Sequence, residues 1–286
     1  MLRVRSLLAL VLVCALASCA SFQFESQRIF LRYQPDSDVL DVLLVYDGVG
    51  GRPGRSDQEK EDRDCAEVVS RIAEGRRHFV VMDGPFEFDL TEIVSDLDRD
   101  DPLAERFLHF EQDIQVLESE LVHGPEQEPC LLQRVRIRNA STGLRLLDAG
   151  FNREVLDDLE DDEGEDAEDA LFLRRARENG SWVHFDGHTL VVSIPTTPHG
   201  AALGLSEALN DDVPWTKQIA RSLTSLEIAG ETALLRFTPA EDGWIRFSFE
   251  KAERGVSRGV QGILADRGAF DDGALEPEIE RLLALE

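Results

Sequence analysis

The chain has 286 residues, of which 42% are apolar, and this is enough to form a substantial core. Its 57 acidic residues outnumber its 30 basic ones, for a formal net charge of −27. Nucleic acids would be repelled by such a surface, and so would anionic lipid headgroups, because both carry negative phosphates. The composition therefore argues against a nucleic-acid partner and allows one large domain or two similar-sized halves.

The first eighteen residues have the layout of a secretory signal. A short basic stretch at 1–5 precedes an apolar run at 6–17, which is too short for a comfortable bilayer span. The leader ends in Leu16-Ala17-Ser18-Cys19, which resembles the lipobox of bacterial lipoproteins. This resemblance implies that the bond before Cys19 is cut, that the cysteine receives a diacylglyceryl thioether, and that the new amine is acylated.

Lipid on Cys19 would attach the protein firmly, because two or more acyl chains hold a protein where one does so only marginally. Ala20 follows, where an Asp would resemble lipoproteins kept at the inner membrane, so the resemblance favours the outer membrane if the cell has two. Residues 19–27 then form a short tether that keeps the folded part close to the membrane. The alternative is an ordinary secretory leader (1–18) in which Cys19 is incidental.

Two further cysteines, Cys65 and Cys130, lie in the folded part. Cys65 shares a helical face with Val69 and Ile72, which suits a buried thiol. Because an exported protein meets an oxidising compartment, a Cys65–Cys130 disulfide is the alternative. Neither cysteine has a second Cys or His at ligand spacing, so we expect no zinc site.

The first half of the folded part, 28–156, is predicted to mix hairpins and helices. Residues 28–33 and 39–46 are rich in β-branched, aromatic and leucine residues around a turn, which predicts a hairpin whose second strand is covered on both faces. A helix at 101–124 is expected to dock on the sheet, with a coiled-coil partner as the alternative. The other elements expected here are a helix at 57–75, strands within 78–90, a strand at 131–138 with one face in water, and a strand at 144–147.

Residues 157–169 carry ten acids and no base. An EF-hand register that places Gly164 sixth puts Leu159 first and Ala170 twelfth, where oxygen ligands are needed, so that pattern fails. Acids before 170–173 and arginines after it suit the dipole of a helix. We interpret the run as a solvated loop and helix start, with a cation-binding or disordered interaction segment as the alternative.

The second half, 170–286, changes to strand periodicity after Gly180. Asp186-Gly187 and Gly230 each lie between two short apolar stretches, which predicts two hairpins. The elements expected after Gly180, including the two hairpins, are strands at 181–185, 189–195, 225–229, 232–238 and 244–251, a helix within 198–221, and a terminal helix from Pro277 with Ile279, Leu282 and Leu283 inward. Tight turns imply antiparallel pairing, so the predicted class is α+β with antiparallel sheets and packed helices.

One motif has the form of a hydrolase nucleophile elbow, Gly255-Val256-Ser257-Arg258-Gly259. Hydrolases of that kind place a histidine after the serine, but the last histidine here is His199. The sequence therefore does not predict a catalytic role for Ser257. The glycines at 48, 50, 51 and 54 lack a following GK[ST], which excludes a P-loop.

Two histidines, His184 and His188, flank Asp186-Gly187 and could suggest a zinc or copper site. In a two-residue hairpin they occupy adjacent rungs and tend toward opposite faces, so we expect surface residues and not ligands. The carboxylates Asp83, Glu87 and Asp89 could do acid–base work, but such neighbours are common in so acidic a chain.

The leading hypothesis is a membrane-anchored envelope lipoprotein without catalytic residues or cofactor, which acts as a binding, assembly or structural component with an envelope protein or polymer as partner. Two alternatives are a tethered hydrolase using carboxylates, with or without Ca²⁺, and a lipoprotein that carries a cation or small ligand on 157–169.

Overall fold

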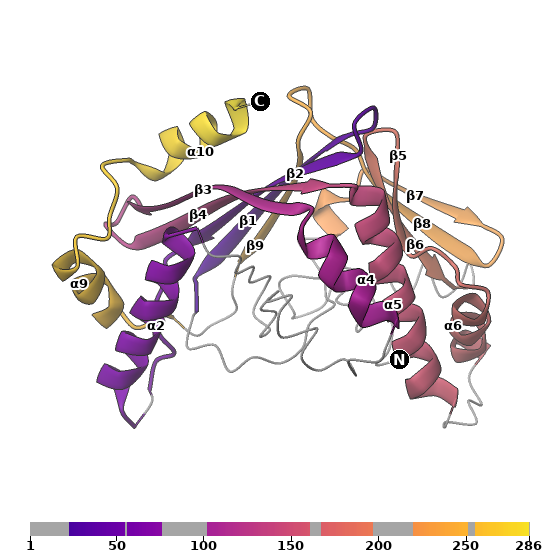
Figure 1. The fold of residues 1–286 in the computed structure, drawn as a ribbon, viewed down its shortest axis with the longest axis horizontal. Helices are drawn as coiled ribbons and strands as arrows, with labels where there is room; N and C mark the ends of the chain where they lie inside the picture. Colours follow the sequence, from indigo (N-terminus) through magenta and orange to yellow (C-terminus); the bar gives the residue numbers. More distant parts are fainter. Residues whose placement is uncertain are drawn as a thin grey trace.

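The structure, a computed structural model, describes residues 23–54, 56–75, 102–160, 167–196, 220–250 and 255–285. It contains a five-stranded and a four-stranded antiparallel sheet with helices packed around them, which confirms the predicted α+β class (Figure 1). In the part of the chain that it describes, no helix is long and apolar enough to cross a bilayer. The predicted leader and Cys19 lie outside the described residues.

The larger sheet has the strand order β3-β4-β2-β1-β9. The predicted first hairpin is confirmed, with strand pairing from Ser26↔Asp47 to Gln34↔Val39. The strands of this sheet are β1 (Ser26–Gln34), β2 (Val39–Asp47), β3 (Ile114–His123), β4 (Pro129–Arg138) and β9 (Ile245–Glu250). Because β9 comes from the second half of the chain, that half completes a sheet built mainly by the first.

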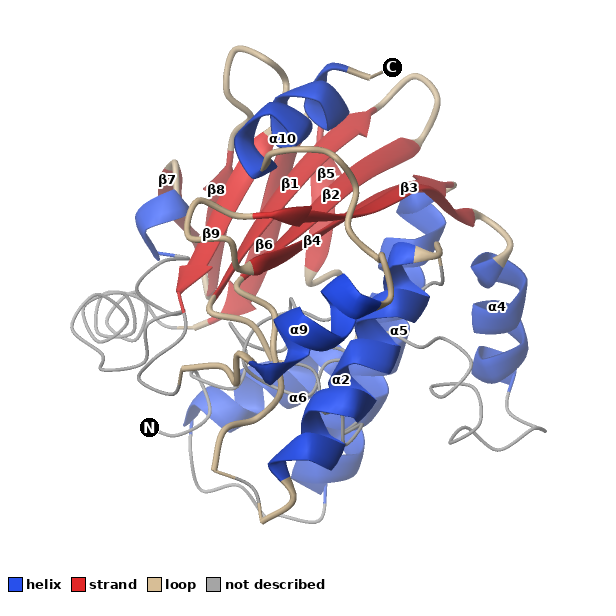
Figure 2. Cartoon of the chain, turned by 90° about the vertical axis from the view of Figure 1, so that its left-hand side faces the viewer, coloured by secondary structure: helices blue, strands red, loops and turns tan. Residues whose placement is uncertain are grey.

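Strand β2 is covered on both faces, as its apolar sequence predicts. Leu44 and Tyr46 join a core cluster with helices α2 (Gln58–Ala73) and α9 (Gly259–Asp266), whereas Leu43 and Val45 join another under helix α10 (Leu275–Ala284). In both views, α10 lies above the sheet and α2 with α9 below it (Figure 1 and Figure 2). Alternation along a strand thus divides one apolar run between two cores.

The smaller sheet has the order β5-β6-β8-β7 and contains both hairpins predicted for the second half. Its strands are β5 (Val183–Asp186), β6 (Thr189–Pro195), β7 (Ser225–Ala229) and β8 (Thr232–Phe237). The largest core cluster includes side chains of both sheets, and the rings of Phe237 and Phe247 lie 5.2 Å apart between them. The two predicted halves therefore share one core.

The helix predicted at 101–124 is wrong in its second part. Helix α4 (Pro102–Glu111) ends early, and β3 follows and pairs with β4. A β-bulge between Val116 and Glu118 shifts the strand's alternation. Ile114 and Leu121 consequently face the same side of the sheet at a spacing that resembles a helical stripe, which explains the error.

The strand predicted at 144–147 is also wrong, because helix α5 (Ala140–Glu160) occupies this segment. Its first turn is capped by Asp38, which accepts hydrogen bonds from the backbone N–H (2.9 Å) and hydroxyl (2.7 Å) of Ser141. Gly143 allows α5 to approach α4, since a Cβ there would lie 2.2 Å from the ring of Phe110. The cap lies 103 residues away in the chain, so no local pattern announces it.

Other predictions are confirmed with shifted boundaries. Helix α2 follows an Asp57 cap and ends before Gly75, whose φ is +88°. Helix α6 (Ala167–Arg177) starts within the acidic run as predicted, but residues 157–160 belong to the end of α5 and not to a loop. Helix α10 starts two residues before Pro277. Helix α9 had no counterpart in the sequence-based prediction. The predicted elements within 78–90 and most of 198–221, together with residues 161–166, lie outside the described residues.

Candidate functional site

The loop at 48–51, which the sequence presents only as glycine-rich, is held by backbone hydrogen bonds from three directions. Gly50 exchanges two with Gln23, at 2.8 and 2.9 Å, and Val49 donates one to Pro129. Ser257 donates another to the carbonyl of Gly51. We call this loop with Gln23 the junction, because it joins the start of the fold to the β3–β4 hairpin and the start of α9.

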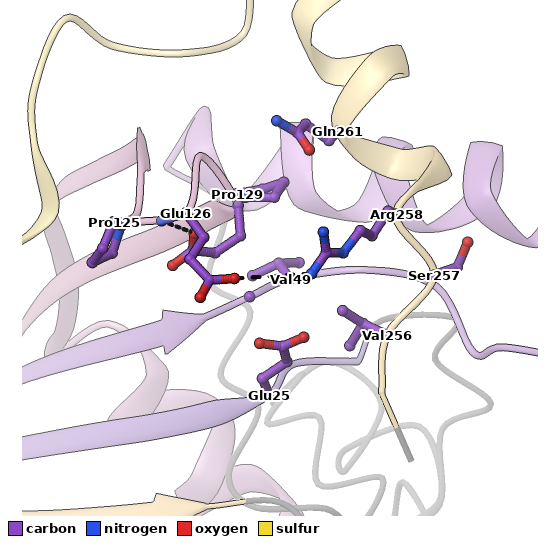
Figure 3. A pocket seen from close by; sticks show the side chains of 11 residues that line it. Glu25, Val49, Pro125, Glu126, Pro129, Val256, Ser257, Arg258 and Gln261 are labelled. Atoms are coloured by element: carbon purple, nitrogen blue, oxygen red, sulfur yellow. Dashed lines mark hydrogen bonds and ion pairs between the residues drawn. The ribbon is translucent and has the colours of Figure 1, made fainter.

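A cavity of about 320 Å³ lies beside the junction (Figure 3). Its lining combines three carboxylates, one guanidinium and several apolar side chains, and comprises Glu25, Gly48, Val49, Pro125, Glu126, Glu128, Pro129, Val256, Ser257, Arg258 and Gln261. Arg258 extends toward Glu126, and the closest N–O distance is 4.0 Å with both side chains more than 80% exposed. Such an exposed pair contributes little to stability, so the rim is free to rearrange around a ligand.

Ser257 lines this cavity but is not arranged as a nucleophile. Its hydroxyl donates to Oδ2 of Asp62 at 3.0 Å, and Asp62 is itself buried. Among the described residues no histidine is hydrogen-bonded to Ser257, so the serine–histidine pair of a hydrolase elbow is missing there. A Cβ at Gly259 would lie 2.1 Å from Oδ2 of Asp62. The Gly-x-Ser-x-Gly pattern thus serves the packing of α9 on α2.

The two histidines lie near the tip of the β5–β6 hairpin. The pairing Asp186↔Thr189 places Gly187 and His188 in the turn, one residue later than predicted, and both histidines are exposed. Nδ1 of His188 lies 2.9 Å from the carbonyl oxygen of Tyr33, so it contacts the β1–β2 hairpin. Within the described segments no three His, Cys, Asp or Glu side chains are grouped to hold a metal ion.

The two remaining cysteines are free and fully buried, in core clusters on opposite faces of the larger sheet. Burial raises the pKa of the Cys65 thiol well above its usual range and that of Cys130 to about 12. In the structure they are the buried thiols of the first interpretation, and the disulfide is not formed. Thiols of this kind stay protonated and unreactive at neutral pH.

A cluster of charge that the sequence did not predict as a site surrounds Asp41, whose side chain has no exposed area. Arg136 donates two hydrogen bonds to it, at 2.7 and 3.1 Å, and Arg32 donates one at 3.1 Å. Arg134 lies 4.0 Å away, and both Arg32 and Arg134 also donate to the carbonyl of Leu285 after α10. The β4 face predicted to meet water is therefore partly covered, and Arg134 is buried.

Burial alone would raise the pKa of Asp41, but the hydrogen bonds from Arg136 and Arg32 outweigh it and hold the pKa below its usual range. The signal in the sequence was a single carboxylate inside the apolar strand 39–46, opposite arginines at alternate positions of 131–138. All three arginines lie within 4.0 Å of Asp41, and two of them also bind the carbonyl of Leu285, so we regard the cluster as the contact that fixes the end of α10 to the sheet.

Comparison of the chain with models of protein families, with curated proteins and with solved structures gave no match. The function therefore has to be argued from the residues alone.

Proposed function

We propose that the protein is a membrane-anchored lipoprotein of the bacterial cell envelope and that it acts as a non-enzymatic binding or structural component. The observation that carries the proposal is the Leu16-Ala17-Ser18-Cys19 sequence after a basic and then apolar leader. Lipid at Cys19 would hold the folded part at the membrane.

Two features of the folded part support the proposal. The net charge of −27 is that of a soluble body that does not adhere to anionic lipid by itself, so attachment depends on the anchor. The cavity beside the junction brings together carboxylates, a guanidinium and apolar groups, which suits binding. Its one hydroxyl, that of Ser257, donates to the buried carboxylate of Asp62, and in the described residues no histidine is hydrogen-bonded to it.

The anchor is tested by expressing the full chain in a bacterium that is fed a fatty acid with a clickable tag. We expect the wild-type protein to take up the tag and to fractionate with membranes, and Cys19→Ala to lose both properties. The matched control is Cys14→Ala, which changes a cysteine inside the leader and should leave both unchanged. Membrane fractionation of Cys19→Ala, or an untagged wild type, would contradict the proposal.

The choice of membrane is tested by a second pair of variants. If the resemblance to outer-membrane lipoproteins holds in a two-membrane host, the wild type separates with the outer membrane and Ala20→Asp with the inner one. Ala20→Ser is the matched control and should behave like the wild type. Recovery of wild type and Ala20→Asp in the same membrane fraction would contradict the outer-membrane assignment and leave the anchor intact.

A further inference from the structure

The fold begins closer to the predicted anchor than the 19–27 tether suggested. Strand β1 starts at Ser26, and Gln23 is already fixed by its two hydrogen bonds to Gly50. Four peptide units separate Cys19 from Gln23, and a fully extended chain covers at most about 14 Å over that distance. An anchor on Cys19 would therefore hold the junction itself within about 14 Å of the lipid.

The residues nearest this attachment point come from the glycine loop and from the three segments that it joins. Exposed among them are Glu25 before β1, Arg52 after the glycine loop, Glu126 in the β3–β4 turn and Arg258 before α9. The cavity opens among the same segments (Figure 3). The surface next to the anchor is thus fixed by the fold and does not depend on the conformation of the tether.

The far ends of β1 and β2, with the turn between them, lie away from the junction. Both strands are nine residues long and run side by side from the junction to a turn at 35–38 (Figure 1). At about 3.3 Å per residue, β1 alone separates the two ends by about 26 Å. Asp36 and Ser37 are exposed in that turn.

Charge favours an upright arrangement over one lying flat. Tilting the distal turn toward the bilayer would bring the exposed Asp36 within the screening length of about 10 Å from anionic headgroups, where like charges repel. The junction end also carries acids, but the tether holds it near the lipid regardless. The rest of the body is therefore pushed away from the surface.

We propose that the junction end, with Arg52, Glu126, Arg258 and the cavity, faces the headgroup layer of the bilayer, and that the β1–β2 turn points away from it. This inference rests on the proposed function, because it needs the lipid on Cys19. It assigns the cavity to molecules that are present at the membrane surface.

The test places one fluorescent label on an introduced cysteine of the full, lipidated chain. Glu126→Cys and Arg52→Cys report on the junction end, and Ser37→Cys and Asp36→Cys on the distal turn. The native Cys65 and Cys130 are buried and stay unlabelled, and Cys19 would carry lipid. Each protein is reconstituted into phosphatidylcholine vesicles that contain phosphatidylglycerol and a headgroup-nitroxide lipid as quencher. Flotation of the same samples reports on attachment.

We expect all four proteins to float and the two junction labels to be quenched several-fold more than the two distal labels. Floating protein with equal quenching at both ends, or stronger quenching at the distal turn, overturns the orientation and leaves the anchor standing. Protein that does not float with the vesicles overturns the anchor and the orientation together. Two positions at each end guard against a single variant that fails to fold.

Discussion

The fold shifts the pKa values of two buried aspartates in opposite directions. Asp41, in the middle of the larger sheet, lies against three arginines, and its pKa is lowered because the hydrogen bonds from Arg136 and Arg32 outweigh the effect of burial. Asp148, on α5, accepts hydrogen bonds from the backbone N–H groups of Trp182 (2.8 Å) and Val183 (3.2 Å). Burial raises its pKa, and those hydrogen bonds only partly oppose the rise.

The difference teaches what each carboxylate does. Asp41 neutralises arginines that also hold the end of α10, so its negative charge is needed. Asp148 joins α5 to the start of β5, and there an oxygen acceptor is needed more than a charge. The two regions therefore predict different responses to removing the charge alone.

The largest effect is expected from Asp41→Asn, which keeps the shape of the side chain and removes its charge. The three guanidinium groups would then lose the carboxylate that they share. Removing one partner of a buried ion pair costs about 3–5 kcal/mol of unfolding free energy. Denaturant unfolding of the soluble domain measures the loss. The control Asp36→Asn, in the exposed turn, should stay within about 0.5 kcal/mol of wild type. A loss below about 1 kcal/mol at Asp41 would contradict the role assigned to its charge.

This cluster also shows how far the sequence could lead. The hairpins were predictable because alternation and turn residues lie within a few positions of each other, as in β5–β6 and β7–β8. The arginines around Asp41 come from β1 and β4, and two of them also bind the carbonyl of Leu285, which lies 253 positions from Arg32 and 151 from Arg134. Their meeting therefore depends on strand register and on where the end of α10 packs. Local patterns carry no information about such contacts.

The errors in the fold have the same origin. The bulge in β3 removed the period-two pattern that identifies a strand, and the cap of α5 came from Asp38 in another hairpin. For the candidate site, the sequence singled out the glycines at 48–51 and Ser257 separately. It could not show that a backbone hydrogen bond joins them beside one cavity.

A smaller effect is expected at Asp148, where two substitutions separate the acceptor from the charge. Asp148→Ala leaves the buried N–H groups of Trp182 and Val183 without their acceptor and should cost about 1–3 kcal/mol of unfolding free energy. Asp148→Asn keeps an oxygen in the same place and should cost less than Asp148→Ala. Unfolding free energies of both variants, measured with denaturant, distinguish the role of the acceptor from that of the charge. Equal losses of unfolding free energy for the two variants would show that the charge, and not the acceptor, stabilises the contact between α5 and β5.

The smallest expected effect is a difference in how the unfolding free energies of these proteins depend on pH. A carboxyl whose folded pKa is lowered contributes stability above its unfolded pKa, about 3.9, and loses it as pH falls through the folded pKa. The difference in unfolding free energy between wild type and Asp41→Asn should therefore narrow below about pH 4.

A carboxyl whose folded pKa is raised binds its proton more tightly in the folded state, so its contribution to the unfolding free energy increases as pH falls from neutral toward 3.9. Wild type should consequently gain on Asp148→Asn over that interval, before the difference for Asp41→Asn begins to narrow. Unfolding free energies of the three proteins, measured from neutral pH to acid, test both signs, because comparison at each pH cancels the titration of other carboxylates. If both differences moved in the same direction, the contrast between an arginine-paired and an amide-bonded carboxylate would be wrong.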